Sequence, residues 1–300
     1  MEKKIFEPVS LGSLTAKNRL VRSGTSQGMS TDLTYSNEKL IEIYSALADG
    51  GVGTNITSFP LVDSRVYVTN ERSAFEVYGK ITDMCRRKNC ISIAQLVLVN
   101  AHGNDTNSVC DMFIRSAHTA YECGYDGIQL HAAHGLFLGA FLSVDRAKGT
   151  KLLTDIIRRI KTEIPDFHIS MKINEDVENI SVCQECENAG LDSVEVSGNN
   201  TSKTHIQPLV NEAYFKEFAE ALSDKVHIPV TLVGGNRSIE NMEKLLNESN
   251  IQFMALSRPL ICEPDLPKRW ETGDLAPAKC VSCNMCYRTK WQECIQNTIL

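Results

Sequence analysis

Short apolar runs alternate with longer amphipathic segments along almost the whole 300-residue chain, and this alternation constrains the fold more than any other feature. The pattern is typical of βα units, which assemble into a parallel sheet covered by helices. Eight candidate strands follow from it: Arg19–Ser23, Gly53–Thr57, Ser92–Leu98, Gly127–His131, His168–Ile173, Ser193–Val196, Pro229–Val233 and Phe253–Leu256. An open doubly wound sheet usually has fewer strands and a Gly-rich dinucleotide turn after the first, which is lacking here. The sequence therefore predicts an α/β fold of the closed (β/α)8 type, a TIM barrel.

The amphipathic segments between these runs predict helices. Four of them are Asn37–Ala48, Thr150–Thr162, Val177–Ala189 and Ile239–Asn247. The apolar side chains of the first recur with a spacing that places them on one helix face: Leu40, Ile43, Tyr44 and Leu47. We expect Asn37 to cap the start of this helix and Gly50-Gly51 to end it.

The barrel is predicted to occupy residues 1–272, followed by a cysteine-rich tail over residues 273–300. A formal net charge of −6 disfavours nucleic acid as a partner, because binding phosphates requires a basic surface. No apolar stretch reaches the roughly 18 to 20 residues that cross a bilayer, and no signal-peptide pattern opens the chain. We therefore expect a cytoplasmic protein whose eleven cysteines are free thiols or metal ligands.

Two loops carry residues suited to binding a phosphate group. The seventh predicted strand runs into Gly234-Gly235, where a backbone without side chains can approach an anion closely. The eighth ends at Ser257-Arg258-Pro259, which offers a hydroxyl, a guanidinium and a proline suited to a helix start. The loops after strands seven and eight are where barrels of this type often bind phosphate.

Several motifs together indicate a family. They are Phe6–Val9, Asn18–Ser23, Leu47–Gly53, Gly124–Gly135, Gly234-Gly235, Ser257–Pro259 and Cys280–Asn284. In these motifs the chain resembles the old yellow enzyme family of FMN-dependent oxidoreductases. Within that family it is most similar to the branch of NADH:flavin oxidoreductases and 2,4-dienoyl-CoA reductase. The His-Ala-Ala-His-Gly block that ends the fourth motif is the most specific of them.

The resemblance implies that FMN binds at the C-terminal ends of the strands. Its phosphate would be bound by Gly234, Gly235, Ser257 and Arg258. The flavin ring would be contacted by Ser23, Gly24, Thr25, Ser26, Ser58, Gln95 and Lys172. A cation at Lys172 would stabilise the negative charge that reduction places on the flavin. A glutamine in the apolar run around Gln95 needs a polar partner when buried, which a flavin amide provides.

The resemblance also implies a role for His131 and His134, which bind the oxygen of a ligand stacked over the flavin. Two N–H donors would polarise an activated alkene, so that its β-carbon accepts hydride. A zinc site at this pair is disfavoured, because no third ligand lies nearby in the sequence.

Three departures from the family pattern affect the expected pocket. Leu136 occupies the position of a proton-donating tyrosine, leaving Tyr121, Tyr125 or solvent as substitutes. The loops following strands three and four are shortened to Ala101–Thr106 and Ser143–Ala147. Because both loops normally wall the pocket, we expect a shallow site or one completed by a second copy of the chain.

The tail contains Cys280, Cys283, Cys286 and Cys294, a spacing typical of metal ligands. Four thiolates can hold a [4Fe–4S] cluster, as in the dienoyl-CoA reductase branch, or a structural zinc ion. The spacing differs by one residue from that of the branch and its fourth cysteine comes earlier. A cysteine-rich remnant without metal is therefore a third reading.

The main functional hypothesis is an FMN-dependent oxidoreductase that passes hydride from NAD(P)H to an activated alkene, a quinone or dioxygen. A flavin-binding scaffold or sensor without catalysis is the alternative, favoured by the short loops and by Leu136. A flavoenzyme acting on tRNA is a third hypothesis, which the acidic composition opposes.

Overall fold

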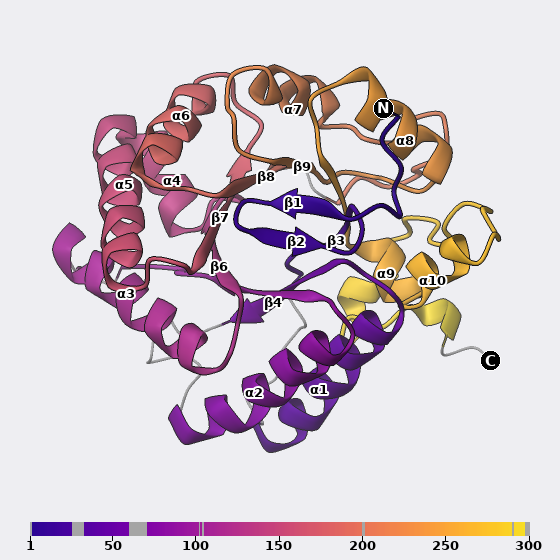
Figure 1. The fold of residues 1–300 in the computed structure, drawn as a ribbon, viewed down its shortest axis with the longest axis horizontal. Coiled ribbons are helices and arrows are strands. Elements are labelled where there is room, and N and C mark those ends of the chain that lie inside the picture. The colour runs from indigo at the N-terminus through magenta and orange to yellow at the C-terminus, as the bar shows by residue number, and fades with distance from the viewer. Residues whose placement is uncertain are drawn as a thin grey trace.

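The computed structural model describes residues 2–25, 33–59, 71–101, 103, 105–199, 202–289 and 291–297. Eight parallel strands close into a barrel, each paired with the next along the chain, and the last, β10, pairs with the first, β3. Helices surround the ring of strands (Figure 1). The predicted (β/α)8 barrel is therefore confirmed.

All eight predicted strands are present, with ends that differ by a few residues at most. The barrel strands are β3 (Leu20–Arg22), β4 (Thr54–Phe59), β5 (Ile91–Leu96), β6 (Gly127–Ala132), β7 (His168–Asn174), β8 (Ser193–Ser197), β9 (Val230–Leu232) and β10 (Phe253–Leu256). Their described side chains are almost entirely buried, because the helices cover the outer face and side chains fill the inside.

Ten α-helices are formed by the part of the chain that the structure describes. They are α1 (Leu33–Asp49), α2 (Glu71–Arg87), α3 (Thr106–Glu122), α4 (Phe137–Val144), α5 (Arg146–Glu163), α6 (Asn179–Ala189), α7 (Lys216–Ser223), α8 (Ile239–Glu248), α9 (Arg258–Cys262) and α10 (Leu266–Glu271). The expected cap at Asn37 is wrong, because α1 begins at Leu33 and Asn37 lies inside it. Leu33 lies two turns before Leu40, so the apolar period extends upstream of the predicted start. The predicted end is right, and Gly51 has a φ of 95° there.

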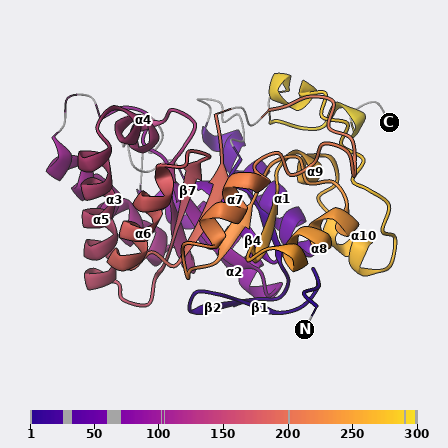
Figure 2. The same cartoon turned by 90° about the horizontal axis from the view of Figure 1, so that it is seen from above.

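An N-terminal hairpin, which the sequence analysis did not predict, covers one end of the barrel. Strands β1 (Val9–Leu11) and β2 (Leu14–Ala16) pair antiparallel around a turn at Gly12. A Cβ on Gly12 would lie only 3.0 to 3.3 Å from Asp192 and the His168 ring, so the turn packs against the barrel. Figure 2 shows the hairpin at the N-terminal end of the strands and the C-terminal tail at the opposite end.

The cysteine-rich tail packs onto the barrel near α9. It contains two short 3₁₀ helices, η1 (Met285–Arg288) and η2 (Ile295–Asn297). The Ala278 N–H donates to the Arg237 carbonyl at 2.9 Å, and the Arg237 Nε donates to the Cys280 carbonyl at 3.1 Å. These contacts place the tail at the end of the barrel where the loops after β9 and β10 lie.

Among the described residues, we find no helix with the length and apolar character that crossing a bilayer requires.

Candidate functional site

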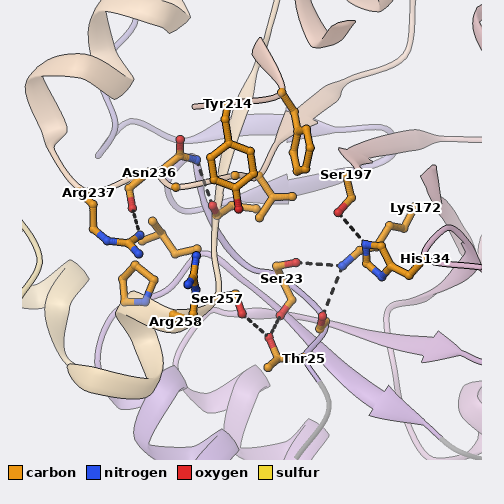
Figure 3. Close-up of a pocket in the computed structure, with 18 of the residues that line it drawn as sticks. Ser23, Thr25, His134, Lys172, Ser197, Tyr214, Asn236, Arg237, Ser257 and Arg258 are labelled. Atoms are coloured by element: carbon orange, nitrogen blue, oxygen red, sulfur yellow. Dashed lines mark hydrogen bonds between the residues drawn. The ribbon is translucent and has the colours of Figure 1, made fainter. Parts of the chain in front are cut away.

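A cavity opens at the C-terminal ends of the barrel strands, where nine of the predicted site residues come together (Figure 3). They are Ser23, Gly24, Thr25, His134, Lys172, Gly234, Gly235, Ser257 and Arg258. Polar or aromatic residues that were not predicted as site residues also line it, namely Ser197, Tyr214, Phe215, Asn236, Arg237, Tyr287 and Gln292. The lining therefore spans the barrel from β3 to the tail.

The described charged side chains that line the cavity are all cations, although the chain as a whole is acidic. Lys172, Arg237 and Arg258 line it, and the described lining residues include no Asp or Glu. The net charge of the full chain is −6, so this local excess of cations is not a consequence of composition. A cavity whose wall carries only positive charge favours an anionic ligand.

One end of the cavity is formed around Lys172 on β7. Its ammonium donates to the Ser23 hydroxyl at 2.9 Å and to the Gly24 carbonyl at 3.3 Å. It also lies 3.3 Å from the Glu195 carboxylate on β8, and both side chains are buried. The lysine is therefore fixed inside the barrel mouth, which is incompatible with a strand-end lysine that simply faces water. We call this region the strand pole.

His131 and His134 lie next to each other at the strand pole, with ring centroids 4.9 Å apart in an edge-to-face arrangement. His134 lines the cavity, whereas His131 lies behind it and is almost fully buried. Burial, with the nearby Lys172 charge, lowers the pKa of His131 well below its ordinary range. The same two causes lower the pKa of His134 to about 4. Both imidazoles are neutral at physiological pH, so they act as hydrogen-bonding groups rather than cations.

Hydrogen bonds fix the orientation of both rings. The Ala133 N–H donates to Nδ1 of His131 at 3.4 Å, which leaves Nε2 to carry the proton. Nε2 of His134 lies 2.8 Å from the Ser197 hydroxyl. The backbone N–H of His134 donates to the side-chain amide oxygen of Asn174. His134 has a φ of 58°, in the left-handed region, which turns the chain sharply after β6.

Gln95 and Ser58 are not among the cavity-lining residues. Gln95 is buried directly behind Gly24, where a Cβ on Gly24 would lie 2.5 Å from the Gln95 amide nitrogen. Ser58 pairs with Gln95 in the sheet, and its N–H donates to the Tyr44 hydroxyl at 2.9 Å. The structure therefore brings Gln95 next to the site, whereas Ser58, on the intervening strand β4, lies outside the cavity lining. Ser26 lies outside the described residues.

The other end of the cavity is formed by the loops after β9 and β10, and we call it the loop pole. Gly234 and Gly235 have φ values of 122° and 84°, which strongly favour glycine. A Cβ on either would lie 2.8 Å from an aromatic ring, Phe215 for Gly234 and Tyr214 for Gly235. The two glycines therefore allow the backbone at this end of the cavity to pack closely against these rings.

Arg258 begins α9 at the loop pole, followed by Pro259 in the first turn. Its guanidinium donates to the Lys203 carbonyl at 2.8 Å and to the Asn284 amide oxygen. Ser257 shares a hydrogen bond of 2.9 Å with the Thr25 hydroxyl, which links β10 to the segment after β3. The predicted phosphate-binding residues therefore converge, with a cation already oriented by the tail.

Arg237 is the third cation of the cavity and is almost fully buried. It donates to the Ser282 hydroxyl at 2.7 Å and approaches the Cys280 sulfur at 3.7 Å. Burial lowers the pKa of Arg237, an effect that the nearby Cys280 opposes. Because Arg237 and Arg258 both bind tail residues, the tail forms part of the wall of the loop pole.

Neither tyrosine proposed as a substitute proton donor lines the cavity. Tyr121 is exposed at the end of α3. Tyr125 is buried just before β6 and shares a 2.7 Å hydrogen bond with Thr57, and burial raises its pKa well above the ordinary value. Leu136 immediately precedes α4, where it supplies no ionisable group. The tyrosines that do line the cavity are Tyr214 and Tyr287.

The four tail cysteines lie near one another: burial has the largest effect in raising the pKa of Cys286, and Cys280, Cys294 and Cys283 all contribute to that rise. Within the described residues, no group of three or more His, Cys, Asp or Glu side chains is arranged to hold a metal ion. Cys286 is buried and Cys283 is exposed. A fifth cysteine, Cys262 on α9, lies beside Cys294, and burial together with that thiol raises the pKa of Cys262 to about 12. The metal site stays a prediction from spacing alone.

The residues that the sequence analysis missed fall into two groups. The missed residues on strands could be detected from the alternation of side chains along a strand. Glu195 and Ser197 are two residues apart and therefore face the same side of β8. Gln129 and His131 are related in the same way on β6. Tyr214 lies in an irregular segment between β8 and α7, where no periodicity indicates which side chain faces the barrel.

Comparisons with known proteins find relatives that are named as NADH-dependent oxidoreductases. No protein-family model matches the chain. It is 23% identical to an NADH-dependent flavin oxidoreductase, iliE, of Neonectria sp. (strain DH2), over 87% of this chain and 46% of that protein. It is 24% identical to iliE of Hypocrea jecorina (strain QM6a), over 87% of each chain. It is 26% identical to an NADH oxidase of Thermoanaerobacter brockii, over 94% of this chain and 53% of that one. The chain thus spans about half the length of two of these relatives.

Solved structures share the fold at low sequence identity. An old yellow enzyme homologue of Zymomonas mobilis has a TM-score of 0.71 at 16% identity, covering 92% of this chain and 94% of that one. Morphinone reductase has a TM-score of 0.72 at 15% identity, covering 91% and 90%. A 2-naphthoyl-CoA reductase has a TM-score of 0.79 at 17% identity, covering 93% of this chain and 54% of that one. At these identities the likeness establishes the barrel alone.

Proposed function

We propose that the chain is an FMN-dependent NAD(P)H oxidoreductase of the old yellow enzyme type, which its motifs predicted and its similarity to NADH-dependent flavin oxidoreductases supports. The observation that supports this most strongly is the cavity with two polar ends. One end holds a buried lysine, the other holds two glycines and two arginines, and no described lining residue is acidic.

The donor set of this cavity fits FMN, which has a polar ring edge at one end and a dianionic phosphate at the other. At the loop pole, Arg258 and the Ser257 hydroxyl would hold the phosphate, with backbone N–H groups of Gly234 and Gly235. At the strand pole, Lys172 would face the pyrimidine edge of the flavin ring, with Gln95 next to it behind Gly24. FMN supplies hydride chemistry, accepting hydride from reduced nicotinamide and passing it to an electron-poor acceptor.

The protein residues have separate tasks in this proposal. Lys172 provides a positive charge that is already fixed in a buried site, so the protein around it needs little rearrangement when the flavin is reduced. His134, a neutral imidazole at the cavity wall, would hold an acceptor oxygen by hydrogen bonding. His131 would hold the His134 ring in place from behind and could add a second N–H donor once an acceptor is bound.

The nature of the acceptor is part of the proposal. Leu136 supplies no proton, and neither Tyr121 nor Tyr125 reaches the cavity. Alkene reduction needs a proton placed at the α-carbon, for which the described cavity wall leaves only Tyr214, Tyr287 or solvent. A quinone or dioxygen, in contrast, takes its protons on oxygen atoms directly from water. We therefore propose a quinone or dioxygen as the acceptor ahead of an activated alkene.

A flavin-binding protein without catalysis is the second candidate function. The observation that favours it is the 2.8 Å contact between His134 Nε2 and Ser197, which occupies a nitrogen that an acceptor would need. The two candidate functions differ in whether NADH or NADPH reduces the bound flavin: the oxidoreductase requires this reaction and the non-catalytic protein does not.

The test is anaerobic stopped-flow mixing of the FMN-loaded protein with NADH and, separately, with NADPH. Bleaching of the flavin absorbance by either nucleotide, followed by reoxidation with a quinone, is the expected result. Stable binding of FMN with no bleaching by either nucleotide would favour the non-catalytic candidate. Failure to bind FMN at micromolar concentration would overturn both candidates.

A further inference from the structure

A chain of buried polar side chains crosses the interior of the barrel beneath the strand pole. Its members come from four neighbouring strands and from the end of β3: Gln95 on β5, Gln129 on β6, Lys172 on β7, Glu195 on β8, and Ser23 after β3. None is more than 5% exposed. The interior of such barrels is usually filled by branched apolar side chains, so a continuous polar layer requires an explanation.

Hydrogen bonds connect the members of this layer to the Glu195 carboxylate from two sides. The Gln95 amide donates to Gln129 at 2.7 Å, and the Gln129 amide donates to one Glu195 oxygen at 2.9 Å. The Ser23 hydroxyl donates to the other Glu195 oxygen at 2.5 Å while accepting from Lys172 at 2.9 Å. Every described polar contact of the carboxylate is with a donor, which is the arrangement that suits an ionised group.

The layer also fixes Lys172. Its three N–H donors have three partners within 3.3 Å, namely Ser23, the Gly24 carbonyl and Glu195. Lys172 and Glu195 are directly opposite each other in the β7–β8 register, so the sheet itself sets their separation. A buried lysine and glutamate in contact form a pair with no net charge, and such a pair is stable when the remaining hydrogen bonds are satisfied.

The pair already acts on its surroundings. The pKa of His134 is lowered by the Lys172 charge and raised by the Glu195 charge, although burial has the largest effect. Any group bound at the strand pole would be subject to the same two opposing charges, because the medium there is buried and screens them little.

We propose that Glu195 is a positioning residue that holds the Lys172 ammonium toward the flavin edge and offsets its positive charge. This inference rests on the proposed binding of FMN. Two-electron reduction adds negative charge to the flavin edge, which Lys172 stabilises and Glu195 destabilises. Glu195 therefore lowers the midpoint potential that Lys172 alone would give, so that electrons leave readily for a weak acceptor.

The test measures the midpoint potential of bound FMN in the full-length protein by anaerobic dye-coupled reduction. Glu195→Gln keeps the size and most hydrogen bonds but removes the charge. We expect the ratio of reduced to oxidised flavin at a fixed potential to rise at least tenfold, which is about 30 mV for a two-electron couple. Glu195→Asp, which keeps the charge, should stay near the wild-type value. Glu178→Gln, an exposed carboxylate following β7, is the control for a non-specific change in charge.

A double variant keeps the proposal testable if Glu195→Gln does not fold, because an unpaired buried lysine destabilises a protein. In Lys172→Met/Glu195→Gln both charges are absent. In this double variant, the ratio of reduced to oxidised flavin at a fixed potential should lie within tenfold of the wild-type ratio. In Lys172→Met alone, the same ratio should be at least tenfold lower than in the wild type.

Three outcomes would overturn the proposal. An unchanged or lowered potential in folded Glu195→Gln would contradict the offset of charge, while leaving the proposed function intact. A double variant whose midpoint potential is as low as that of Lys172→Met alone would also contradict the offset of charge and leave the proposed function intact. Failure of wild-type protein to bind FMN would overturn this inference and the proposed function together.

Discussion

The two ends of the cavity are built in different ways. At the strand pole, Lys172 and Glu195 are fixed by register in the sheet and bonded to each other inside the barrel. At the loop pole, Arg237 extends from the loop after β9 and Arg258 from the first residue of α9, and both are fixed by hydrogen bonds to Ser282 and Asn284 of the tail. Chemistry that depends on exact placement of charge is therefore assigned to strands, and binding of a phosphate is assigned to loops.

This difference predicts that changes at the two poles have different consequences. A change at the strand pole should alter the rate of flavin reduction more than it alters FMN affinity. A change at the loop pole should do the reverse, because phosphate contacts are made equally in the oxidised and reduced states.

Lys172→Met should have the largest effect. Loss of a preorganised charge at a buried reaction site typically slows the chemical step by about 10²- to 10³-fold. We expect a decrease of that order in the rate of flavin bleaching by NADH in stopped-flow measurements. Lys172→Arg should retain much of the rate because it keeps the charge, and a wild-type rate in Lys172→Met would show that the strand pole lies away from the chemistry.

Arg258→Met should weaken FMN binding by about a hundredfold, or roughly 3 kcal/mol, the usual loss for one partner of a buried charge-assisted contact. Fluorescence quenching on titration of the apoprotein with FMN measures this. Arg288→Met is the matched control, because Arg288 is an exposed arginine of the tail. Equal affinities in the two variants would contradict a phosphate site at the loop pole.

Acidification should destabilise the protein through its buried histidines. Burial lowers the pKa of His134 and of His168 to about 4, against an ordinary value of about 6.5. Between these values the unfolded chain binds more protons than the folded one, so the free energy of unfolding falls as the pH decreases through this range. From pH 7 to pH 5 the expected loss is about 2 kcal/mol for each of the two histidines.

Urea unfolding at pH 7 and pH 5 checks this loss. His168 is the better probe, since it lies beneath the hairpin at the N-terminal end of β7, away from the cavity. His168→Asn should show a smaller decrease between the two pH values than the wild-type protein. An identical decrease would mean that His168 does not titrate in this range.

Asn284→Ala should have the smallest effect. Its amide connects Arg258 to the Ser202 carbonyl, so its loss removes one constraint on the arginine. We expect FMN affinity to fall about fivefold, close to 1 kcal/mol, the typical value of one hydrogen bond. Asn297→Ala removes a different tail hydrogen bond, to Cys262, and serves as the control. If Asn297→Ala weakened FMN binding more than Asn284→Ala did, the tail would support FMN binding through contacts other than the one between Asn284 and Arg258.

The sequence predicted the barrel well because its signal is local and repeated. Each apolar run and each amphipathic segment indicates one element, and eight repeats of the pair leave few alternative folds. The hairpin at Gly12 was missed, although its strands alternate around a Gly-Ser turn, because three-residue strands give a weak signal. The early start of α1 was missed because capping by Asn37 was inferred from residue type alone.

The site was only partly predictable. Residues at strand ends, such as Lys172 and Ser257, could be assigned because the C-terminal ends of all barrel strands meet at one face. Glu195 and Ser197 face the same side of β8, but nothing in the sequence indicates the contact of Glu195 with Lys172. Tyr214 and Arg237 depend on how irregular loops and the tail fold over the cavity, which no periodicity records.

The measurement that tests the central claim most directly compares FMN and riboflavin binding to the apoprotein by fluorescence quenching. The two ligands share the flavin ring and differ in the phosphate. A cavity with a lysine at one pole and two arginines at the other predicts micromolar or tighter binding of FMN. It also predicts riboflavin binding weaker by at least a hundredfold, a difference of about 3 kcal/mol. Equal binding of the two, or no binding of either, would contradict the two-poled flavin site.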